Sequence, residues 1–341
     1  MKETLSTIAS RLGVSVSTVS RVLSGDARRH RIPQATADRI LAEARRCRYT
    51  PSHSAQALRT RKSYAIGLVI PSMSNPFFAD MASVVISEAN LKGYTTIIID
   101  TMEAESNQKL ALDSMLSRQV EGVIAAPCGG EEDLLALDSA GVPVVLIDRY
   151  FEHSSLSYVT TNNYKGGVMA TRALIDAGHR DIVCVQGVTS SMPNEMRVRG
   201  YMDTMTGAGQ AGRIKVVGRE FSIQNGYIET RMLLNGQDRP SAIFALSNTI
   251  GLGAMKAIRE MNLRIPDDIS LISYDNNIYL DYMIPPVARV SQPLEDMSRL
   301  AIKLLFERIA EPAIPASHVM LSPSLIPGGS ISLISGGGRS L

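Results

Sequence analysis

Apolar positions at helical spacing fill the first fifty residues of the chain and predict three short helices. Thr4 can cap the first helix, Gly13 ends it, and Ser15 can cap the second. Pro33 suits the first turn of the third helix. Two short helices joined by a tight turn with glycine are typical of a helix-turn-helix, which lays the start of its second helix in the major groove of DNA. The pattern alone also fits a three-helix bundle without a ligand.

From residue 63 onward, apolar runs rich in β-branched residues alternate with amphipathic helical stretches. The predicted strands are 65–71, 95–100, 122–126, 142–148, 182–187, 214–218, 242–246 and 270–275. Continuous apolar strands that alternate with helices form parallel sheets covered by helices on both faces. This number of strands leaves open a closed barrel, a single large sheet or two smaller sheets.

Three features favour two smaller sheets. The two successive series of strands and helices are each long enough for a doubly wound lobe. Between them, residues 157–167 are polar and end in two glycines, as a crossover between lobes would be. The helix expected near 293–310 comes late, as though the chain returns to the first lobe. We therefore predict an α/β core of two doubly wound lobes that follows an N-terminal all-α helix-turn-helix domain.

The composition narrows the class of protein. The chain has 341 residues, of which 45% are hydrophobic and 20% charged, and no apolar run is long enough for a transmembrane helix. Because the first residues lack the apolar run of a secretory signal, we expect a cytoplasmic protein with no membrane partner. Cys47, Cys128 and Cys184 lie far apart, which fits neither a disulfide framework nor a zinc site. We expect no metal and no other cofactor.

The charge is unevenly distributed along the chain. Residues 1–62 hold 13 Lys and Arg against 4 Asp and Glu, whereas the whole chain carries a net charge of only +2. The remaining 279 residues are therefore acidic, with a net charge of −7. A small basic segment on a large acidic one indicates that the basic segment binds a polyanion.

The amino-acid sequence of the basic segment indicates its function more specifically than its charge does. Residues 4–25, TLSTIASRLGVSVSTVSRVLSG, closely resemble the DNA-binding domain of the lactose-repressor (LacI/GalR) family. The resemblance implies that bases are read by Val16, Ser17 and Arg21, and that phosphates are bound by hydroxyl side chains near the second helix. The residues expected at DNA are Thr4, Ser15, Val16, Ser17, Thr18, Ser20, Arg21, Arg28, Arg29, Ala55 and Leu58. Arg28 and Arg29 belong to a long basic loop that is expected to add phosphate contacts.

Residues 49–59, YTPSHSAQALR, resemble the hinge of the same family. In that family the hinge helices of a dimer enter the minor groove, and Leu58 stands at the position of the leucine that wedges between base pairs. The alternative is a linker leucine that packs against the core. Ser24 and Ser52 stand where the family usually has asparagine, so the operator sequence cannot be copied from a relative.

The rest of the chain carries further landmarks of the family. They are SNPFF at 74–78, GYTTIIID at 93–100, VEGVIAAP at 120–127, VPVVLIDR at 142–149, GHRDIVCVQG at 178–187 and MRVRGY at 196–201. The resemblance implies a core similar to periplasmic sugar-binding proteins, with a ligand between the lobes at the carboxyl ends of the strands. The expected divisions are a DNA-binding domain 1–50, a hinge 51–62 and a core 63–341, with a first lobe of 63–160 plus 292–318 and a second of 161–290 plus 320–335.

Candidate effector residues follow from strand ends and from the resemblance. Asp148 and Asp275 each end an apolar strand, where a carboxylate can accept hydrogen bonds from ligand hydroxyls. The resemblance places Arg197 at an effector-binding position, where its fork suits diols, carboxylates or phosphates. Phe77 and Phe221 are candidate aromatic walls. Each candidate has an alternative role. Asp148 could serve merely to pair with Arg149, and Phe77 could belong to the core or a dimer interface.

Departures from the family pattern concern the effector. Ser247 followed by Asn248 replaces the usual Asn–Asp pair, although Ser247 stays a candidate contact. Asn162 replaces an aspartate, and Gly328 lies where many members have arginine. The ligand could therefore be a sugar, a sugar acid, a phosphorylated sugar, a nucleobase or another small polar metabolite.

The sequence favours a transcription regulator over the alternatives. Motifs of phosphate-binding loops, serine hydrolases, zinc proteases and dinucleotide-binding folds are missing, which disfavours a sensor with residual enzyme activity. A transporter's binding protein fits the core but not the basic segment. We predict a repressor that binds a palindromic operator as a homodimer and is controlled allosterically by a small polar effector. The final residues, ISLISGGGRSL, do not resemble the leucine-rich tail that makes the lactose repressor a tetramer.

Overall fold

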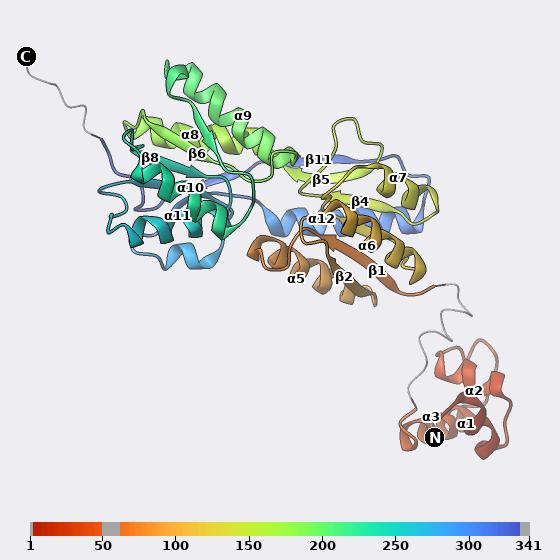
Figure 1. Cartoon of the computed structure of the whole chain (residues 1–341). Coiled ribbons are helices and arrows are strands. Elements are labelled where there is room, and N and C mark those ends of the chain that lie inside the picture. The colour runs from red at the N-terminus through yellow and green to blue at the C-terminus, as the bar shows by residue number, and fades with distance from the viewer. Residues whose placement is uncertain (1–2, 50–61, 335–341) are drawn as a thin grey trace, which may run out of the picture. The chain divides into compact units, whose positions relative to one another are not determined.

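The computed structural model describes residues 3–49 and 62–334 of the chain. They divide into two compact units, residues 1–63 and 64–341, which we name the head and the body and describe separately (Figure 1). The helices of the head are α1 (Leu5–Leu12), α2 (Val16–Leu23) and α3 (Gln34–Arg46).

Side-chain caps define the first two helices of the head. Thr4 Oγ1 accepts a hydrogen bond from the backbone N–H of Thr7, and Thr7 Oγ1 accepts one from the N–H of Thr4, so each satisfies a free donor of the first turn. Gly13 ends α1 with a φ of 65°, a conformation that glycine adopts without strain. Ser15 Oγ caps α2 through the N–H of Thr18 at 3.1 Å. Both predicted caps are confirmed, while Pro33 precedes α3 instead of lying in its first turn.

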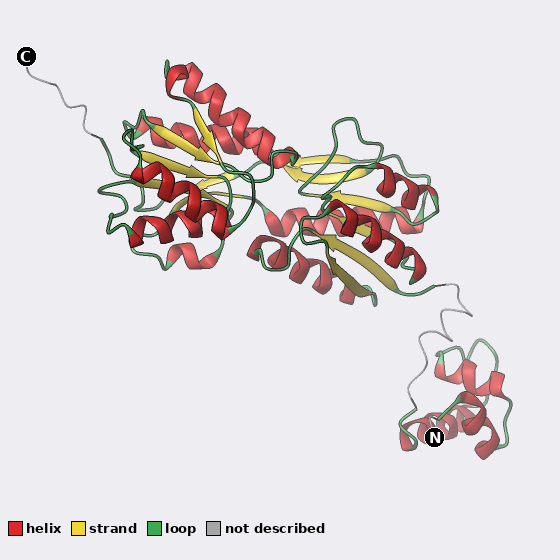
Figure 2. Ribbon diagram, viewed as in Figure 1, coloured by secondary structure: helices red, strands yellow, loops and turns green. Residues whose placement is uncertain are grey.

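The body contains two six-stranded sheets, each covered by helices on both faces (Figure 2). The first lobe has the strand order β11-β5-β4-β3-β1-β2, and all its strand pairs are parallel. Its strands are β1 (Ala65–Ile70), β2 (Thr95–Asp100), β3 (Val123–Ala125), β4 (Val144–Ile147), β5 (Ser157–Thr161) and β11 (His318–Leu321). Its helices are α5 (Pro76–Leu91), α6 (Glu105–Ser117), α7 (Glu132–Ser139) and α12 (Leu294–Ala310).

The second lobe repeats this plan with the order β12-β10-β9-β8-β6-β7, in which β12 alone runs antiparallel to its neighbour. Its strands are β6 (Ile182–Val185), β7 (Lys215–Val217), β8 (Ala242–Ala245), β9 (Ser270–Tyr274), β10 (Ala288–Ser291) and β12 (Ser324–Ile326). Its helices are α8 (Asn163–Asp176), α9 (Met192–Gly207), α10 (Ile223–Asn235) and α11 (Asn248–Glu260), with short 3₁₀ turns at Ala211–Arg213 and Ile278–Asp281. The predicted fold of two doubly wound lobes is confirmed.

The chain passes between the lobes three times, and this positions the space between them. The crossings follow β5, β10 and β11. Residues 157–161, which the polar pattern places in a crossover, form the buried strand β5 instead, and the crossing follows it. The expected return to the second lobe at residue 320 falls inside β11, which pairs with β5 as far as Leu321. In the part of the chain that the structure describes, no helix combines the length and apolar character needed to span a membrane.

Candidate functional site

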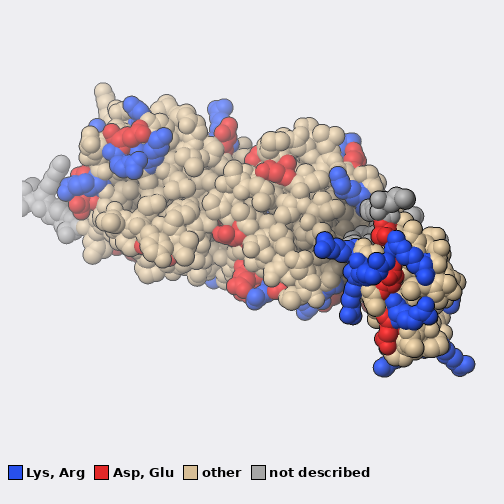
Figure 3. Space-filling view, turned by 90° about the horizontal axis from the view of Figure 1, so that it is seen from below, with Lys and Arg blue, Asp and Glu red and all other residues tan. Residues whose placement is uncertain are grey.

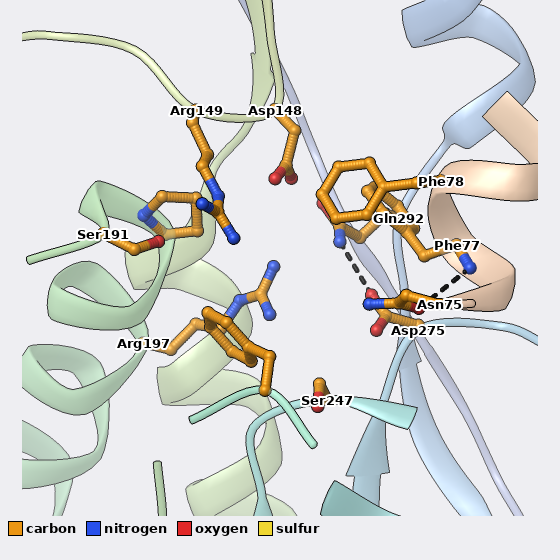
Figure 4. Close-up of a pocket in the computed structure, with 12 residues that line it drawn as sticks. Asn75, Phe77, Phe78, Asp148, Arg149, Ser191, Arg197, Ser247, Asp275 and Gln292 are labelled. Atoms are coloured by element: carbon orange, nitrogen blue, oxygen red, sulfur yellow. Dashed lines mark hydrogen bonds between the residues drawn. The ribbon is translucent and has the colours of Figure 1, made fainter. Parts of the chain in front are cut away.

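A small cavity of about 20 Å³ lies between the two lobes, where the carboxyl ends of their strands face each other (Figure 4). The structure brings all six candidate effector residues of the body to its wall. The lining residues are Asn75, Phe77, Phe78, Asp148, Arg149, Ser191, Pro193, Arg197, Phe221, Ser247, Asp275 and Gln292. Candidate residues that lie as much as 198 positions apart in the sequence, such as Phe77 and Asp275, therefore share one small space.

Asp148 lies directly after β4, in the left-handed backbone region with a φ of 63°. Its side chain is buried, and Oδ1 has no hydrogen-bond partner among the described residues. Burial raises the pKa of Asp148 to about 6, and the positive charges of Arg197 and Arg149 oppose that shift. The carboxylate is thus an acceptor held ready at a site with little water.

Arg149, the next residue, forms an ion pair with Glu103. Its Nη2 and Nη1 atoms donate to the two oxygens of Glu103 at 2.7 and 2.8 Å, in a bidentate ion pair. The guanidinium carbon also lies 5.9 Å from the ring centres of both Phe78 and Phe221. The alternative in which Asp148 merely pairs with Arg149 does not describe this geometry, because Arg149 pairs with Glu103.

Asp275 occupies the corresponding place after β9, with a φ of 71°. Its Oδ2 accepts a hydrogen bond from the backbone N–H of Asn248 at 3.2 Å, and its Oδ1 accepts one from Gln292 Nε2 at 2.8 Å. Asn248 begins α11, so the carboxylate lies at the positive end of a helix. Gln292 lies in the crossing after β10. Its hydrogen bond therefore joins the end of β9 to a segment that connects the two lobes.

Arg197 is held rigidly on α9. Its Nε donates to Asn163 Oδ1 at 2.8 Å and its Nη1 to the carbonyl of Leu246 at 2.7 Å. The guanidinium also stacks on Tyr274, 3.7 Å from the ring centre. Arg197 lines the cavity, and its guanidinium points toward the space between the lobes (Figure 4).

Aromatic rings close the cavity on two sides. Phe77 and Phe78 begin α5 and meet edge to face, with ring centres 5.1 Å apart. Phe221 comes from the second lobe and packs on Gly187, where an added Cβ would lie 2.3 Å from its ring. Flat apolar walls around a few fixed polar groups are the usual construction of a small-molecule site.

Three buried polar atoms of the cavity lining have no hydrogen-bond partner among the described residues: Asp148 Oδ1, Ser191 Oγ and Gln292 Oε1. An unpaired buried polar atom destabilises the fold, so such atoms call for an explanation. Two of them can only accept a hydrogen bond, and Ser191 can also donate one. A molecule with several hydroxyl groups would satisfy all three.

Ser247 differs from the other candidates because its hydroxyl already has partners. Ser247 Oγ caps α11 through the N–H of Ile250 at 3.2 Å and shares a hydrogen bond with Thr249 Oγ1 at 3.0 Å. In the described part of the body, no set of three or more His, Cys, Asp and Glu side chains is placed to hold a metal ion.

Half of the lining residues were not among the candidates: Asn75, Phe78, Arg149, Ser191, Pro193 and Gln292. Asn75 and Phe78 belong to the SNPFF landmark, and Arg149 follows a candidate aspartate, so their neighbourhood was a usable signal. Ser191 and Pro193 lie at the start of α9, where helix N-termini gather around the cavity. Gln292 lies in a crossing that no local pattern marks.

The head exposes the residues expected at DNA on and around α2. Val16, Ser17 and Arg21 are exposed, whereas Val19 and Val22 of the same helix are buried. Ser15, Thr18 and Ser20 lie beside them, Thr4 is exposed at the start of α1, and Arg28 and Arg29 are exposed in the loop before α3. Ala55 and Leu58 lie outside the described residues. Groups of lysine and arginine side chains, with some acidic side chains between them, lie on the visible face of the head (Figure 3).

Comparison with known proteins gives two family matches. Residues 4–52 match the model described as bacterial regulatory proteins, lacI family, and residues 171–331 match that of a periplasmic binding protein-like domain. The chain is 31% identical over 325 residues to the ribose operon repressor of Haemophilus influenzae, covering 95% of this chain and 97% of the relative. It is 29% identical to the transcriptional repressor PurR of Pectobacterium carotovorum, covering 95% of each.

One solved structure has a similar fold over almost the whole chain. The lac repressor dimer bound to operator and the anti-inducer ONPF aligns with a TM-score of 0.87 at 23% identity, covering 97% of this chain and all of that one. At 23% sequence identity, this structural similarity establishes the fold alone.

Proposed function

Since this chain belongs to the lacI family of bacterial regulatory proteins, we propose that it represses transcription by binding a palindromic operator as a homodimer under the control of a pentose sugar. It is a regulator with a DNA-binding head and an effector-binding body, and not an enzyme. As a bacterial repressor it works in the cytoplasm, where its operator lies.

The observation that carries the effector class is the set of unpartnered polar atoms in the interlobe cavity. Asp148 Oδ1, Ser191 Oγ and Gln292 Oε1 have no partner among the described residues, and they line the cavity together with Arg197. Hydroxyl groups spaced around a sugar ring can donate to the two acceptors while a ring or hydroxyl oxygen accepts from the guanidinium. Phe77 and Phe221 would pack against the C–H faces of the same ring.

The name of a relative narrows the class of sugar, whereas the size of the cavity does not. The cavity measures about 20 Å³, far below the usual volume of small-molecule sites, so the lobes must move apart to admit any sugar. The name of the relative at 31% identity, a ribose operon repressor, agrees with a five-carbon sugar.

The head supports recognition of DNA through the start of α2. Val16 exposes an apolar side chain suited to a thymine methyl, Ser17 pairs with several bases, and Arg21 can reach a guanine or a phosphate. Ser15 and Thr18 lie at the positive end of the helix, where backbone N–H groups and hydroxyls bind phosphate. Two heads in a dimer then fix the spacing of the half-sites.

The two functions are coupled by linkage. A sugar that binds between the lobes favours one degree of closure, and closure changes the first lobes, from which the hinges extend. Such coupling is typically about 1–3 kcal/mol and is reciprocal, so the operator must change the affinity for the sugar by the same factor.

The test begins with selection of genomic fragments by the purified full-length protein, followed by sequencing. We expect a palindrome with two half-sites. D-ribose and D-xylose are then titrated against the protein–operator complex, with hypoxanthine as a matched non-sugar probe. A change in operator affinity with a pentose and none with hypoxanthine supports the proposal, and the reverse result rejects the pentose while leaving the regulator in place.

A further inference from the structure

A second, larger chamber adjoins the inner cavity and shares Arg149 and Ser191 with it. This outer chamber has a volume of about 530 Å³ and is formed by the loops after β2, β3, β4 and β6. Its lining residues are Glu103, Glu105, Pro127, Cys128, Gly129, Gly130, Arg149, Tyr150, Phe151, Glu152, Val188, Ser190, Ser191, Met192 and Glu195. Any group that projects from a ligand past Arg149 and Ser191 would enter it.

The lining of the outer chamber is strongly acidic. Its single cation, Arg149, forms a bidentate ion pair with Glu103, so these two charges cancel. Glu105, Glu152 and Glu195 remain, and the lining residues include no lysine or histidine. Three uncompensated carboxylates around one space create a negative potential that attracts cations and repels anions.

Backbone geometry directs one of these carboxylates into the chamber. Glu105 Oε1 accepts a hydrogen bond from the backbone N–H of Gly130 at 3.2 Å. An added Cβ at Gly129 would lie 2.4 Å from Glu105 Cγ. Gly129 therefore makes the room that Glu105 occupies, and the backbone N–H of Gly130 holds its carboxylate.

Tyr150 forms a fixed aromatic part of the chamber lining. Its ring stacks on Tyr158 at 4.6 Å, and Tyr158 stacks in turn on His318 at 4.4 Å. Burial raises the pKa of Tyr150, and the negative charges of Glu152 and Glu195 raise it further. Both carboxylates are therefore close enough to act on one phenol, although Glu152 and Glu195 come from different lobes.

Ser191 independently indicates a ligand at the junction of the two spaces. It is only 6% exposed, and its Oγ has no hydrogen-bond partner among the described residues. Because Ser191 lines both the inner cavity and the outer chamber, a ligand that reaches this hydroxyl lies at the boundary between them.

We propose that the outer chamber sets the charge of the effector: Glu105, Glu152 and Glu195 accept a sugar whose outward substituent is a hydroxyl or an ammonium group and exclude a phosphate ester. This proposal rests on the proposed function for the identity of the sugar. The negative potential of the chamber does not rest on it and can be measured without a ligand.

The first test uses Cys128, a half-buried thiol in the lining, as a probe of local charge. In a Cys47→Ser background the other thiol, Cys184, is fully buried. We expect a cationic methanethiosulfonate reagent to modify Cys128 faster than an anionic one, by about tenfold relative to the same pair acting on free 2-mercaptoethanol.

The triple variant Glu105→Gln, Glu152→Gln, Glu195→Gln should bring this ratio down to the value for the free thiol. A control variant with the same net charge, Asp176→Asn, Asp238→Asn, Glu311→Gln, removes three exposed carboxylates outside the chamber and should keep the ratio high. A ratio in the unmodified chamber at or below that of the free thiol overturns the proposal.

The second test compares D-ribose with D-ribose 5-phosphate by calorimetry on the full-length protein. We expect the phosphate ester to bind at least about tenfold more weakly, and the triple Gln variant to narrow the gap while the control variant preserves it. Equal or tighter binding of the ester overturns the charge selection and leaves the pentose proposal standing. If neither sugar binds, the pentose proposal fails, and the labelling ratio still decides the charge of the chamber.

Discussion

Asn248 Nδ2 of the second lobe donates a hydrogen bond to Asn75 Oδ1 of the first lobe, 3.1 Å away. The same Nδ2 also donates to Asn277 Oδ1, and Asn277 Nδ2 reaches back to Asp80 of the first lobe at 3.2 Å. A buried chain of amides thus joins the lobes beside the cavity. The backbone N–H of Asn248 also donates to Asp275, so lobe closure and the candidate effector site share a residue.

Removing this link should weaken effector binding. We expect Asn248→Ala to lower the affinity for the sugar about fivefold, because a net hydrogen bond contributes about 1 kcal/mol and the closed state would lose the one that Asn248 donates across to Asn75. Calorimetry measures the affinity, and Asn235→Ala at the exposed end of α10 serves as the control. An Asn248→Ala protein that binds the sugar as tightly as the parent would show that the amide chain does not contribute to closure.

Arg197 should separate effector response from DNA binding. Its fork is held by Asn163 and Leu246, and hydrogen bonds from a charged group contribute about 1.5–3 kcal/mol. Arg197→Ala should therefore abolish the response to the sugar in a gel-shift assay, with operator affinity in the absence of sugar unchanged. Arg199→Ala, two residues further along the same helix and exposed, is the matched control. A normal response in Arg197→Ala would reject its role.

Much of the fold follows from local sequence patterns. The strand predicted at 95–100 has the observed bounds, and the caps Thr4 and Ser15 lie where hydroxyl residues precede apolar stripes. The strands β5, β10, β11 and β12 were missed because they are short and each contains polar residues. Such segments become strands only because an existing sheet edge pairs with them, which local propensity does not record.

The sequence predicts those residues of the site that directly follow apolar strands. Asp148 and Asp275 follow apolar strands directly, whereas Gln292 and Ser191 acquire their place from the crossing and from the meeting of the lobes. Ser247 shows that residue type alone does not predict a ligand contact. The residue lines the cavity, but its hydroxyl caps α11. Which hydroxyl is committed to the backbone depends on tertiary geometry.

Effector binding should depend on pH through Asp148. Burial raises the pKa of this carboxyl to about 6, and a sugar hydroxyl that donates to Oδ1 prefers the ionised form, so binding releases a proton near that pH. Affinity should therefore fall as the pH is lowered from about 7.5 to about 5.5. Calorimetry across this range measures the slope, and Asp148→Asn should flatten it. A slope that survives in Asp148→Asn would assign the proton to another group.

The same shift predicts a trend in stability without ligand. The folded state binds the Asp148 proton more tightly than the unfolded chain, whose carboxyl has the ordinary value of 3.8. The contribution of this group to stability is therefore full below the unfolded pKa and is lost as the pH rises from 3.8 through about 6. The difference in denaturation midpoint between the parent and Asp148→Asn should change over this window and stay constant above it.

Leu58 lies outside the described residues, and its proposed role is tested through DNA. If it wedges between base pairs, Leu58→Ala should weaken binding to the selected operator much more than binding to random DNA, because the energy of the kink is recovered only through specific contacts. Titrations of both DNAs at one salt concentration measure the ratio. Equal loss on the two DNAs would remove the wedge, and a lowered melting temperature with unchanged DNA binding would place the leucine against the body.

Gly187 should control the aromatic wall of the inner cavity. An added Cβ would lie 2.3 Å from two carbons of the Phe221 ring, so Gly187→Ala must displace that ring. Because the clash is with the end of a side chain, the fold should survive while the sugar loses one of its apolar faces, and affinity should fall by at least about tenfold. Gly207→Ala, where an added Cβ meets nothing within 4 Å, is the control. If Gly187→Ala binds the sugar normally, Phe221 does not pack on the ring, and the wall is formed by Phe77 and Phe78 alone.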